Sequence, residues 1–301
     1  MFINASLPTL DEATYRAAER WSISQIKVVP RKPELFYGRY ISGEFEYDPT
    51  AGMLFGTNCH SEFLEGKSCS EVPAEYLTSN GQRRGKAWDF YKETHGALEC
   101  LSKKEVVAVQ GIRKSLDSQP RLANLLWGYG PAEQSIYAED KESGLLIKGR
   151  LDKLRETDEG RILVDLKITG LDSDDGRKMA AQILDMAYHQ QMAFYYDLVT
   201  AAYDEPPEAV VMIFCRDKPP YSARAWMFND NDIDLGRRRN RLAMLDLKRR
   251  LDSGEWSGDR HNQLNCGPDG MLLPKWAYTD DPGDNAAPSA YPEFSNFSDS
   301  E

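Results

Sequence analysis

The stretch Arg161-Ile-Leu-Val-Asp165-Leu-Lys167-Ile-Thr169 sets the fold class, because apolar and polar residues alternate along it as they do in a β-strand. Side chains of a strand point alternately to its two faces, so Val164 and the residues two and four positions after it share an apolar face. Asp165 and Lys167 are neighbours on the opposite face. We therefore predict a strand over 161–169 that buries one face and presents an acid and a lysine on the other.

A second carboxylate belongs to the strand predicted just before this one, over 145–154, which follows another predicted strand at 133–139. A turn at Thr157-Asp-Glu-Gly160 can pair 145–154 with 161–169 as a hairpin. In that hairpin Asp152 approaches the acid and the lysine of the following strand.

Two carboxylates and a lysine at one place suit metal-assisted phosphoryl chemistry. Mg²⁺ prefers carboxylate oxygens and retains several water ligands, and a bound cation lowers the pKa of such a water. Lys167 can orient the attacking water or contact the scissile phosphate. The alternative is a surface hairpin with an ordinary Asp–Lys ion pair, because short motifs also match by chance.

A long helix predicted at 177–203 follows the strand. Leu184, Tyr188, Gln191 and Tyr195 are spaced i, i+4, i+7 and i+11, so they share one face of that helix. A glutamine on an otherwise apolar face needs a hydrogen-bond partner. Gln191 can hold a phosphate or lie near the lysine, or it is a structural residue at the edge of the core.

The remaining pattern predicts an α/β fold, a mixed sheet flanked by helices with a helical N-terminal region. Helices are expected at 22–26, 56–65, 86–104, 105–117 and 231–252, and further strands at 210–215 and 223–228. We expect one domain over 1–278, with a mostly helical part at 1–120 and the sheet core with its flanking helices at 121–278. The tail 279–301 is acidic and is expected to lack regular structure.

The net charge of −11 at first argues against nucleic-acid binding, but its distribution weakens the objection. The tail contains six acids and no lysine or arginine, so residues 1–278 carry −5. Segment 216–250 contains ten basic residues and five aspartates. Arg237 and Arg238, in its arginine cluster, are candidates to grip DNA phosphates, and a solvated helix face is the equal alternative.

The cysteines and the N-terminus indicate a cytoplasmic protein. Five cysteines with wide spacings show no zinc or iron–sulfur pattern, so we expect reduced thiols. No apolar run is long enough to cross a membrane, and the first residues do not resemble a secretory signal. His95, His189 and His261 are expected to be structural or surface residues.

Separated blocks of the sequence together resemble the PD-(D/E)xK nuclease superfamily, and in particular the exodeoxyribonuclease VIII branch of phages and prophages. The central blocks are Lys148-Gly-Arg-Leu-Asp152-Lys153, Val164-Asp165-Leu-Lys167 and Tyr188-His-Gln-Gln191-Met-Ala-Phe-Tyr195. The usual proline before the first aspartate is Leu151 here, and that position is not a metal ligand. The flanking blocks that also resemble the family are 22–26, 33–37, Gly56-Thr-Asn-Cys-His60-Ser-Glu-Phe-Leu64 and 272–277.

The resemblance implies roles for residues at the matching positions. It makes Asp152, Asp165 and Lys167 catalytic, together with Gln191 and Tyr195 of the helix motif. It also implies Mg²⁺, or alternatively Mn²⁺, bound by His60, Asp152 and Asp165, with Glu133 as an additional acid. Arg150, on the strand face of Asp152, and Arg31 are candidates for a 5′-phosphate pocket.

The function implied by the resemblance is 5′-to-3′ exonuclease action on double-stranded DNA ends, leaving 3′ overhangs for homologous recombination in a bacterial or phage-infected cell. The family also implies a homo-oligomer and a single-strand annealing protein as partner. Two alternatives stay open: a PD-(D/E)xK endonuclease or repair nuclease of other polarity, and a catalytically inactive DNA-binding module.

Overall fold

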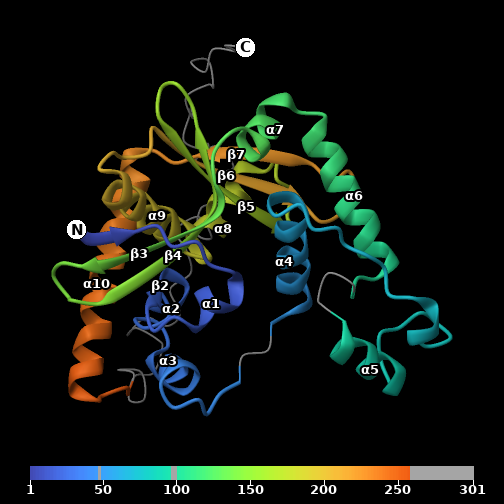
Figure 1. The fold of residues 1–301 in the computed structure, drawn as a ribbon, viewed down its shortest axis with the longest axis horizontal. Helices are drawn as coiled ribbons and strands as arrows, with labels where there is room; N and C mark the ends of the chain where they lie inside the picture. The colour runs from blue at the N-terminus through green and yellow to red at the C-terminus, as the bar shows by residue number, and fades with distance from the viewer. Residues whose placement is uncertain (47–48, 96–99, 258–301) are drawn as a thin grey trace, which may run out of the picture. The chain divides into compact units, whose positions relative to one another are not determined.

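Seven strands form one mixed sheet in the part of the chain that this computed structural model describes, residues 1–46, 49–95 and 100–257 (Figure 1). The order is β1-β3-β4-β5-β6-β7, with β2 beside β4. The pairs β5–β6 and β2–β4 are parallel and the others are antiparallel. The strands are β1 (Phe2–Ser6), β2 (Trp21–Ser22), β3 (Ala132–Asp140), β4 (Leu146–Glu156), β5 (Arg161–Thr169), β6 (Ala209–Arg216) and β7 (Ala223–Met227).

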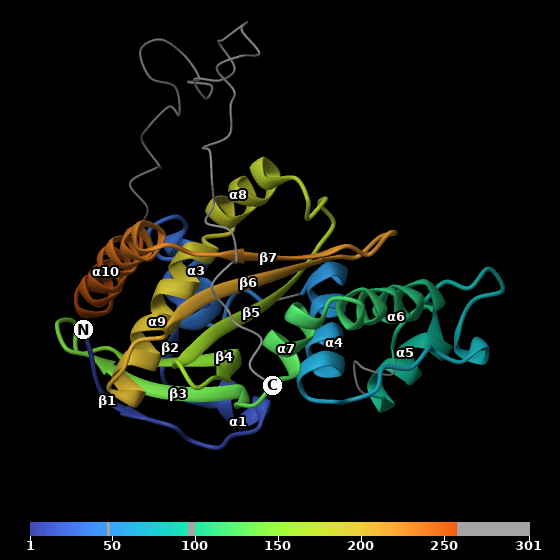
Figure 2. The same ribbon diagram turned by 90° about the horizontal axis from the view of Figure 1, so that it is seen from above.

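Helices cover both faces of the sheet, as expected for the predicted fold class (Figure 2). One hydrophobic core joins the sheet to α2, α9 and α10, and a second joins it to α4, α6 and α7. The helices are α1 (Glu12–Ala17), α2 (Ile23–Ile26), α3 (Pro33–Tyr40), α4 (Ala51–Leu64), α5 (Lys86–Thr94), α6 (Lys103–Asp117), α7 (Pro120–Trp127), α8 (Gly176–Asp185), α9 (Tyr188–Tyr203) and α10 (Asp230–Ser253). No helix of the described residues is long and apolar enough to cross a membrane.

The prediction of one helix over 177–203 is wrong, because the chain breaks between α8 and α9. Ala187 adopts a left-handed backbone conformation with φ 54°, which redirects the chain before Tyr188. Leu184 therefore belongs to the end of α8, where it is 46% exposed, and does not extend the face of Gln191. The conformation of Ala187 comes from tertiary packing, since neither glycine nor proline marks the break.

The prediction of a helix over 86–104 is also wrong, because α5 ends at Thr94. Ser102 then starts α6 through a capping box, in which its hydroxyl accepts from the Glu105 N–H and Glu105 accepts from the Ser102 N–H.

The predicted hairpin between β4 and β5 is confirmed: the Thr157 N–H donates to the Gly160 carbonyl at 2.8 Å. β5 has the predicted bounds, 161–169.

The two hairpin strands separate at the residues singled out in the sequence. β4 and β5 pair from Glu156↔Arg161 as far as Lys153↔Val164, so the next opposed residues in this register are Asp152 and Asp165. There the ladder stops, and the Asp152 carboxylate instead accepts the backbone N–H of Leu166 at 2.8 Å. Nearer its start, β4 pairs with β2. The Asp152 side chain thus takes the place of a hydrogen bond between the two strands, and β4 and β5 separate at this residue.

Gly149 allows α9 to lie close to β4. A Cβ atom at this position would lie 2.4 Å from Leu198 Cδ1 and 3.2 Å from Tyr195 Cε1. A larger residue at this position would therefore force the Leu198 side chain to shift. This packing brings the Gln191 and Tyr195 face of α9 over the opening between β4 and β5.

The expected tail 279–301 lies outside the described residues, as do His261, Cys266 and the block 272–277.

Candidate metal centre and active site

Three ligand-type side chains from three elements converge where β4 leaves β5. They are His60 of α4, Glu133 of β3 and Asp152 of β4, and one ligand atom of each lies within 4.8 Å of the others. His60 Nδ1 is 3.6 Å from Asp152 Oδ2 and 4.0 Å from Glu133 Oε1. Ligand atoms around one octahedral Mg²⁺ are about 3–4.2 Å apart, since each lies about 2.1 Å from the cation. Both distances from His60 Nδ1 lie within this range and therefore fit a divalent cation.

The hydrogen bond of His60 fixes which ring nitrogen faces the two acids. His60 Nε2 lies 2.7 Å from the Leu166 carbonyl oxygen, which can only accept, so Nε2 carries the proton. In the neutral ring Nδ1 then presents a lone pair to two carboxylates. Three lone-pair donors facing one another repel unless a proton or a metal cation lies between them. A ligand histidine commonly donates its second N–H to a carbonyl in this way.

Asp165 lies beside this cluster and is paired with other side chains. Its Oδ2 is 2.5 Å from Lys167 Nζ, and its Oδ1 accepts from Gln191 Nε2 at 3.0 Å. Gln191 Nε2 also lies 3.4 Å from the hydroxyl of Tyr195. The structure thus brings Asp152, Asp165, Lys167, Gln191 and Tyr195 together. Their catalytic roles, and Asp165 as a metal ligand, remain predictions.

Burial and neighbouring negative charge raise the pKa of two acids of the site, Asp152 and Glu133. Asp165 is fully buried and Asp152 is 8% exposed. Burial raises the pKa of Asp152, and the neighbouring Asp165 raises it further. Burial, followed by the charge of Asp152, also raises the pKa of Glu133. A bound cation would stabilise the charged forms of both carboxylates, which burial and mutual repulsion otherwise disfavour.

Lys167 keeps its charge despite burial. Burial alone would lower the pKa of its ammonium, but the charges of Asp165 and Asp152 outweigh this effect and raise the pKa. The ammonium also lies 5.4 Å from the ring centroid of Tyr188. Lys167 is therefore a fixed positive charge next to the three-ligand cluster.

Lys27 is a basic residue of this region that sequence reasoning missed. It follows α2, and its ammonium donates to the Met186 carbonyl at 2.9 Å and lies 5.9 Å from the Tyr188 ring centroid. Burial, and then the nearby Lys167, lower the pKa of Lys27 to about 8. Lys27 and Lys167 are far apart in the sequence, but both ammonium groups lie near the ring of Tyr188. Their proximity is therefore visible only in the folded structure.

The two arginines predicted for a 5′-phosphate pocket differ in their surroundings. Arg31 is exposed and donates to the Asp185 carbonyl at 3.1 Å, next to the carbonyl that Lys27 contacts. Arg150 is only 13% exposed and donates to Glu133 Oε2 at 2.7 Å. Arg31 can therefore meet a ligand from solvent, whereas the guanidinium of Arg150 is committed to protein groups.

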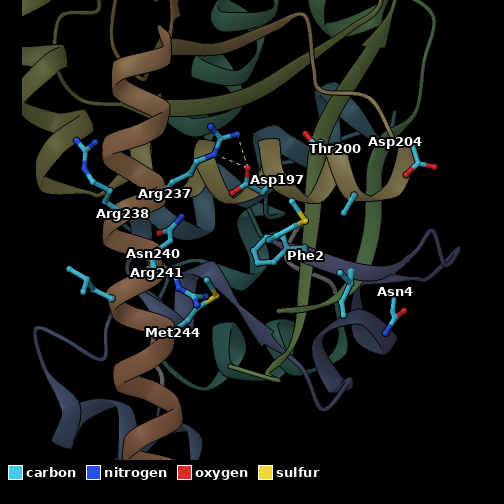
Figure 3. Close-up of a pocket in the computed structure, with 14 residues that line it drawn as sticks. Phe2, Asn4, Asp197, Thr200, Asp204, Arg237, Arg238, Asn240, Arg241 and Met244 are labelled. Carbon is cyan, nitrogen blue, oxygen red and sulfur yellow. Dashed lines mark hydrogen bonds and ion pairs between the residues drawn. The ribbon is translucent and has the colours of Figure 1, made fainter. Parts of the chain in front are cut away.

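Arg237 and Arg238 lie on α10, along an open groove of about 1100 Å³ between β1, α9 and α10. Figure 3 shows Arg237 turned toward Asp197, to which it donates at 2.8 Å, whereas Arg238 extends away from that pair. No hydrogen bond or ion pair joins Arg238 to another described residue. Neither arginine contacts His60, Glu133 or Asp152, so a role in holding DNA remains a prediction that the metal cluster does not support.

The other histidines lie away from the cluster within the described residues. His95 stacks on Tyr91 with ring centroids 3.9 Å apart. His189 is buried, and its Nε2 lies 3.0 Å from Arg239 Nη1, an atom that can only donate.

Comparison with known proteins supports the resemblance seen in the sequence blocks. Residues 22–260 match the family model described as a PDDEXK-like domain of unknown function (DUF3799). A crystal structure of a protein from Eubacterium rectale named "putative exonuclease" has 17% identity and a TM-score of 0.59, over 89% of this chain and 96% of that one. A phage-related exonuclease from Haemophilus somnus 129PT has 13% identity and a TM-score of 0.29, over 66% of this chain and 100% of that one. No curated protein matches the sequence.

The family match covers the whole site, from the block at Ser22 through His60, Asp152 and Lys167 to the end of α10. The match to the E. rectale structure shows the fold independently. The chain therefore belongs to the family of PDDEXK-like domains within the PD-(D/E)xK nuclease superfamily.

Proposed function

We propose that this chain is a divalent-metal-dependent exonuclease acting on double-stranded DNA. The observation that carries the proposal is the convergence of His60, Glu133 and Asp152, with the charged Lys167 beside them. Two carboxylates and one imidazole, without a thiolate, suit Mg²⁺ or Mn²⁺. When bound there, such a cation lowers the pKa of a water ligand and offsets the charge that develops on the phosphate.

The side chains around the cluster have separable tasks in this proposal. His60, Glu133 and Asp152 would hold the cation. Lys167 orients the attacking water or contacts a non-bridging phosphate oxygen, because its charge survives burial. Asp165 keeps Lys167 aligned through the 2.5 Å ion pair, and Gln191 in turn fixes Asp165 by donating to its Oδ1 at 3.0 Å. Asp165 would be a further ligand in this proposal, because each of its oxygens has one described partner and a second lone-pair site.

The exonuclease part of the proposal rests on the resemblance to exodeoxyribonuclease VIII and fits the name of the E. rectale protein. Contacts to phosphates carry no base specificity, so restriction to DNA ends is one way to prevent indiscriminate cutting. We propose 5′-to-3′ polarity, with Arg31 as the candidate for the 5′ phosphate, and 3′ overhangs as products for recombination. A homo-oligomer and a single-strand annealing protein as partner belong to the same proposal.

The test compares a covalently closed duplex circle with the same DNA linearised by one cut and carrying a 5′ phosphate at one end only. With Mg²⁺, the 5′-phosphorylated strand should be degraded to mononucleotides from that end and leave the other strand as a 3′ overhang, while the circle survives. Rapid nicking of the circle would replace the exonuclease proposal with an endonuclease. Degradation that starts at 3′ ends would reverse the polarity.

A further inference from the structure

The guanidinium of Arg150 contacts four residues from three separate parts of the chain. Its Nε donates to Glu133 Oε2 at 2.7 Å. Its Nη1 donates to the Leu10 carbonyl at 3.0 Å and to the Ser135 hydroxyl at 3.3 Å. Its Nη2 lies 3.9 Å from Oε1 of Glu65, the C-cap residue directly after α4. Arg150 thus connects β3, β4 and α4, the three elements that carry the candidate metal ligands.

Glu133 is held in an unusual backbone conformation at the end of this connection. Its φ of 50° lies in the left-handed region, which residues other than glycine rarely adopt within a strand. Such strain persists only where the surrounding structure enforces it, and it is often found at functional sites. Here the strained backbone aims a carboxylate toward His60 and Asp152.

The two oxygens of Glu133 face different partners. Oε2 accepts the hydrogen bond from Arg150, whereas Oε1 lies 4.0 Å from His60 Nδ1. A carboxylate whose one oxygen is held by a hydrogen bond has a fixed orientation, and its other oxygen keeps both lone-pair sites for a cation. The planar fork of an arginine suits this task, because it donates in several fixed directions at once.

We propose that Arg150 is a positioning residue of the metal centre, which fixes Glu133 so that Oε1 faces the cation and holds the ligand-bearing elements in register. This inference rests on the metal centre of the proposed function. It also replaces the expectation that Arg150 binds the DNA 5′ phosphate, because the side chain is only 13% exposed and its Nε and Nη1 already donate to protein groups.

The test measures Mn²⁺ affinity by electron paramagnetic resonance, without DNA, for the wild type, Arg150→Ala and Arg150→Lys. Groups that orient a metal ligand typically contribute about 10–100-fold in metal affinity. We expect a loss of this size in Arg150→Ala and a smaller loss in Arg150→Lys, which keeps the charge but not the fork. Arg155→Ala is the matched control, because Arg155 lies on the same strand and donates to Asn124 and to the Tyr129 carbonyl.

Duplex affinity in EDTA, measured by fluorescence anisotropy, should be equal in the wild type and Arg150→Lys. Unchanged Mn²⁺ affinity in both Arg150 variants would overturn the inference. Unchanged Mn²⁺ affinity combined with weaker DNA binding would restore Arg150 as a phosphate contact.

A double-mutant cycle keeps the inference testable if Arg150→Ala does not fold. If Arg150 acts through Glu133, Arg150→Lys should change Mn²⁺ affinity little in a Glu133→Gln background. Equal effects in both backgrounds would contradict the inference. Mn²⁺ binding that depends on Arg150 in a protein that cleaves no DNA would support the inference and overturn the proposed function. A wild type that binds no Mn²⁺ would overturn both.

Discussion

Replacing Asp152 with asparagine should stabilise the metal-free protein while it removes activity. The carboxylates of Asp152 and Glu133 approach within 4.8 Å, and Asp165 is a further acid next to Asp152. At that separation and an effective dielectric constant of about 20, two unit charges repel by about 3.5 kcal/mol. Lys167 and Arg150 offset part of this repulsion. We therefore expect Asp152→Asn to raise the free energy of unfolding by about 1–2 kcal/mol in EDTA.

The substitution can preserve the local structure. The side-chain oxygen of an asparagine can still accept the Leu166 N–H, which Asp152 accepts at 2.8 Å. For a unit of this size, the gain corresponds to a rise in Tm of about 2–8 °C. Mg²⁺ should then stabilise the wild type by mass action and the variant much less, because one ligand has lost its charge.

The assay is thermal and urea unfolding at pH 8, in EDTA and in millimolar Mg²⁺. Asp158→Asn is the control, since Asp158 is exposed in the β4–β5 turn and lies outside the cluster. A variant less stable than the wild type in EDTA would refute the electrostatic reasoning. Equal stabilisation of both proteins by Mg²⁺ would refute the metal centre.

Two further predictions concern the lysines. Lys167→Ala should lower kcat about 10²–10³-fold in single-turnover cleavage with little change in duplex affinity, because its fixed charge matters most as charge develops on the phosphate; a collapse of affinity with normal kcat would contradict this role. Lys27→Met should raise the free energy of unfolding at pH 7 by about 1–3 kcal/mol, because the pKa of Lys27 is lowered to about 8 in the folded protein and its charged form is therefore disfavoured by folding. This advantage should shrink as the pH rises from about 8 toward 10.5. Urea unfolding across that pH range checks the prediction, and a constant difference between the two proteins would refute it.

Alternation along the sequence was enough to predict β5 and the side-by-side position of Asp165 and Lys167. Period-two patterns are strong signals in a strand that is bounded by glycines, here Gly160 and Gly170. The left-handed turn at Ala187 was not predictable, because no glycine or proline marks it and packing of α9 on the sheet determines it. β1 was missed for a similar reason, since it pairs with β3, a strand far away in the sequence, as in the pair Phe2 and Asp140.

In the candidate site, too, contacts between residues close in the sequence could be predicted, whereas contacts between distant segments could not. Residue patterns bring Asp152 near Asp165, but His60 and Glu133 became candidates only through the family resemblance. The partners of Arg150 could not be read from its neighbours, because Leu10 and Glu65 reach it from distant segments. The strand-face argument placed Arg150 near the site correctly, and only the structure shows that Glu133 occupies its guanidinium.

Metal-dependent cleavage is tested most directly with a linear duplex, the wild type and Asp165→Asn, in Mg²⁺ and in EDTA, with duplex binding measured in parallel. Asp165 is fully buried and aligns Lys167 beside the His60–Glu133–Asp152 cluster. We expect the wild type to degrade the duplex only with Mg²⁺, and Asp165→Asn to bind the duplex without degrading it. Wild-type degradation in EDTA, or near wild-type turnover by Asp165→Asn, would rule out the proposed metal-dependent active site.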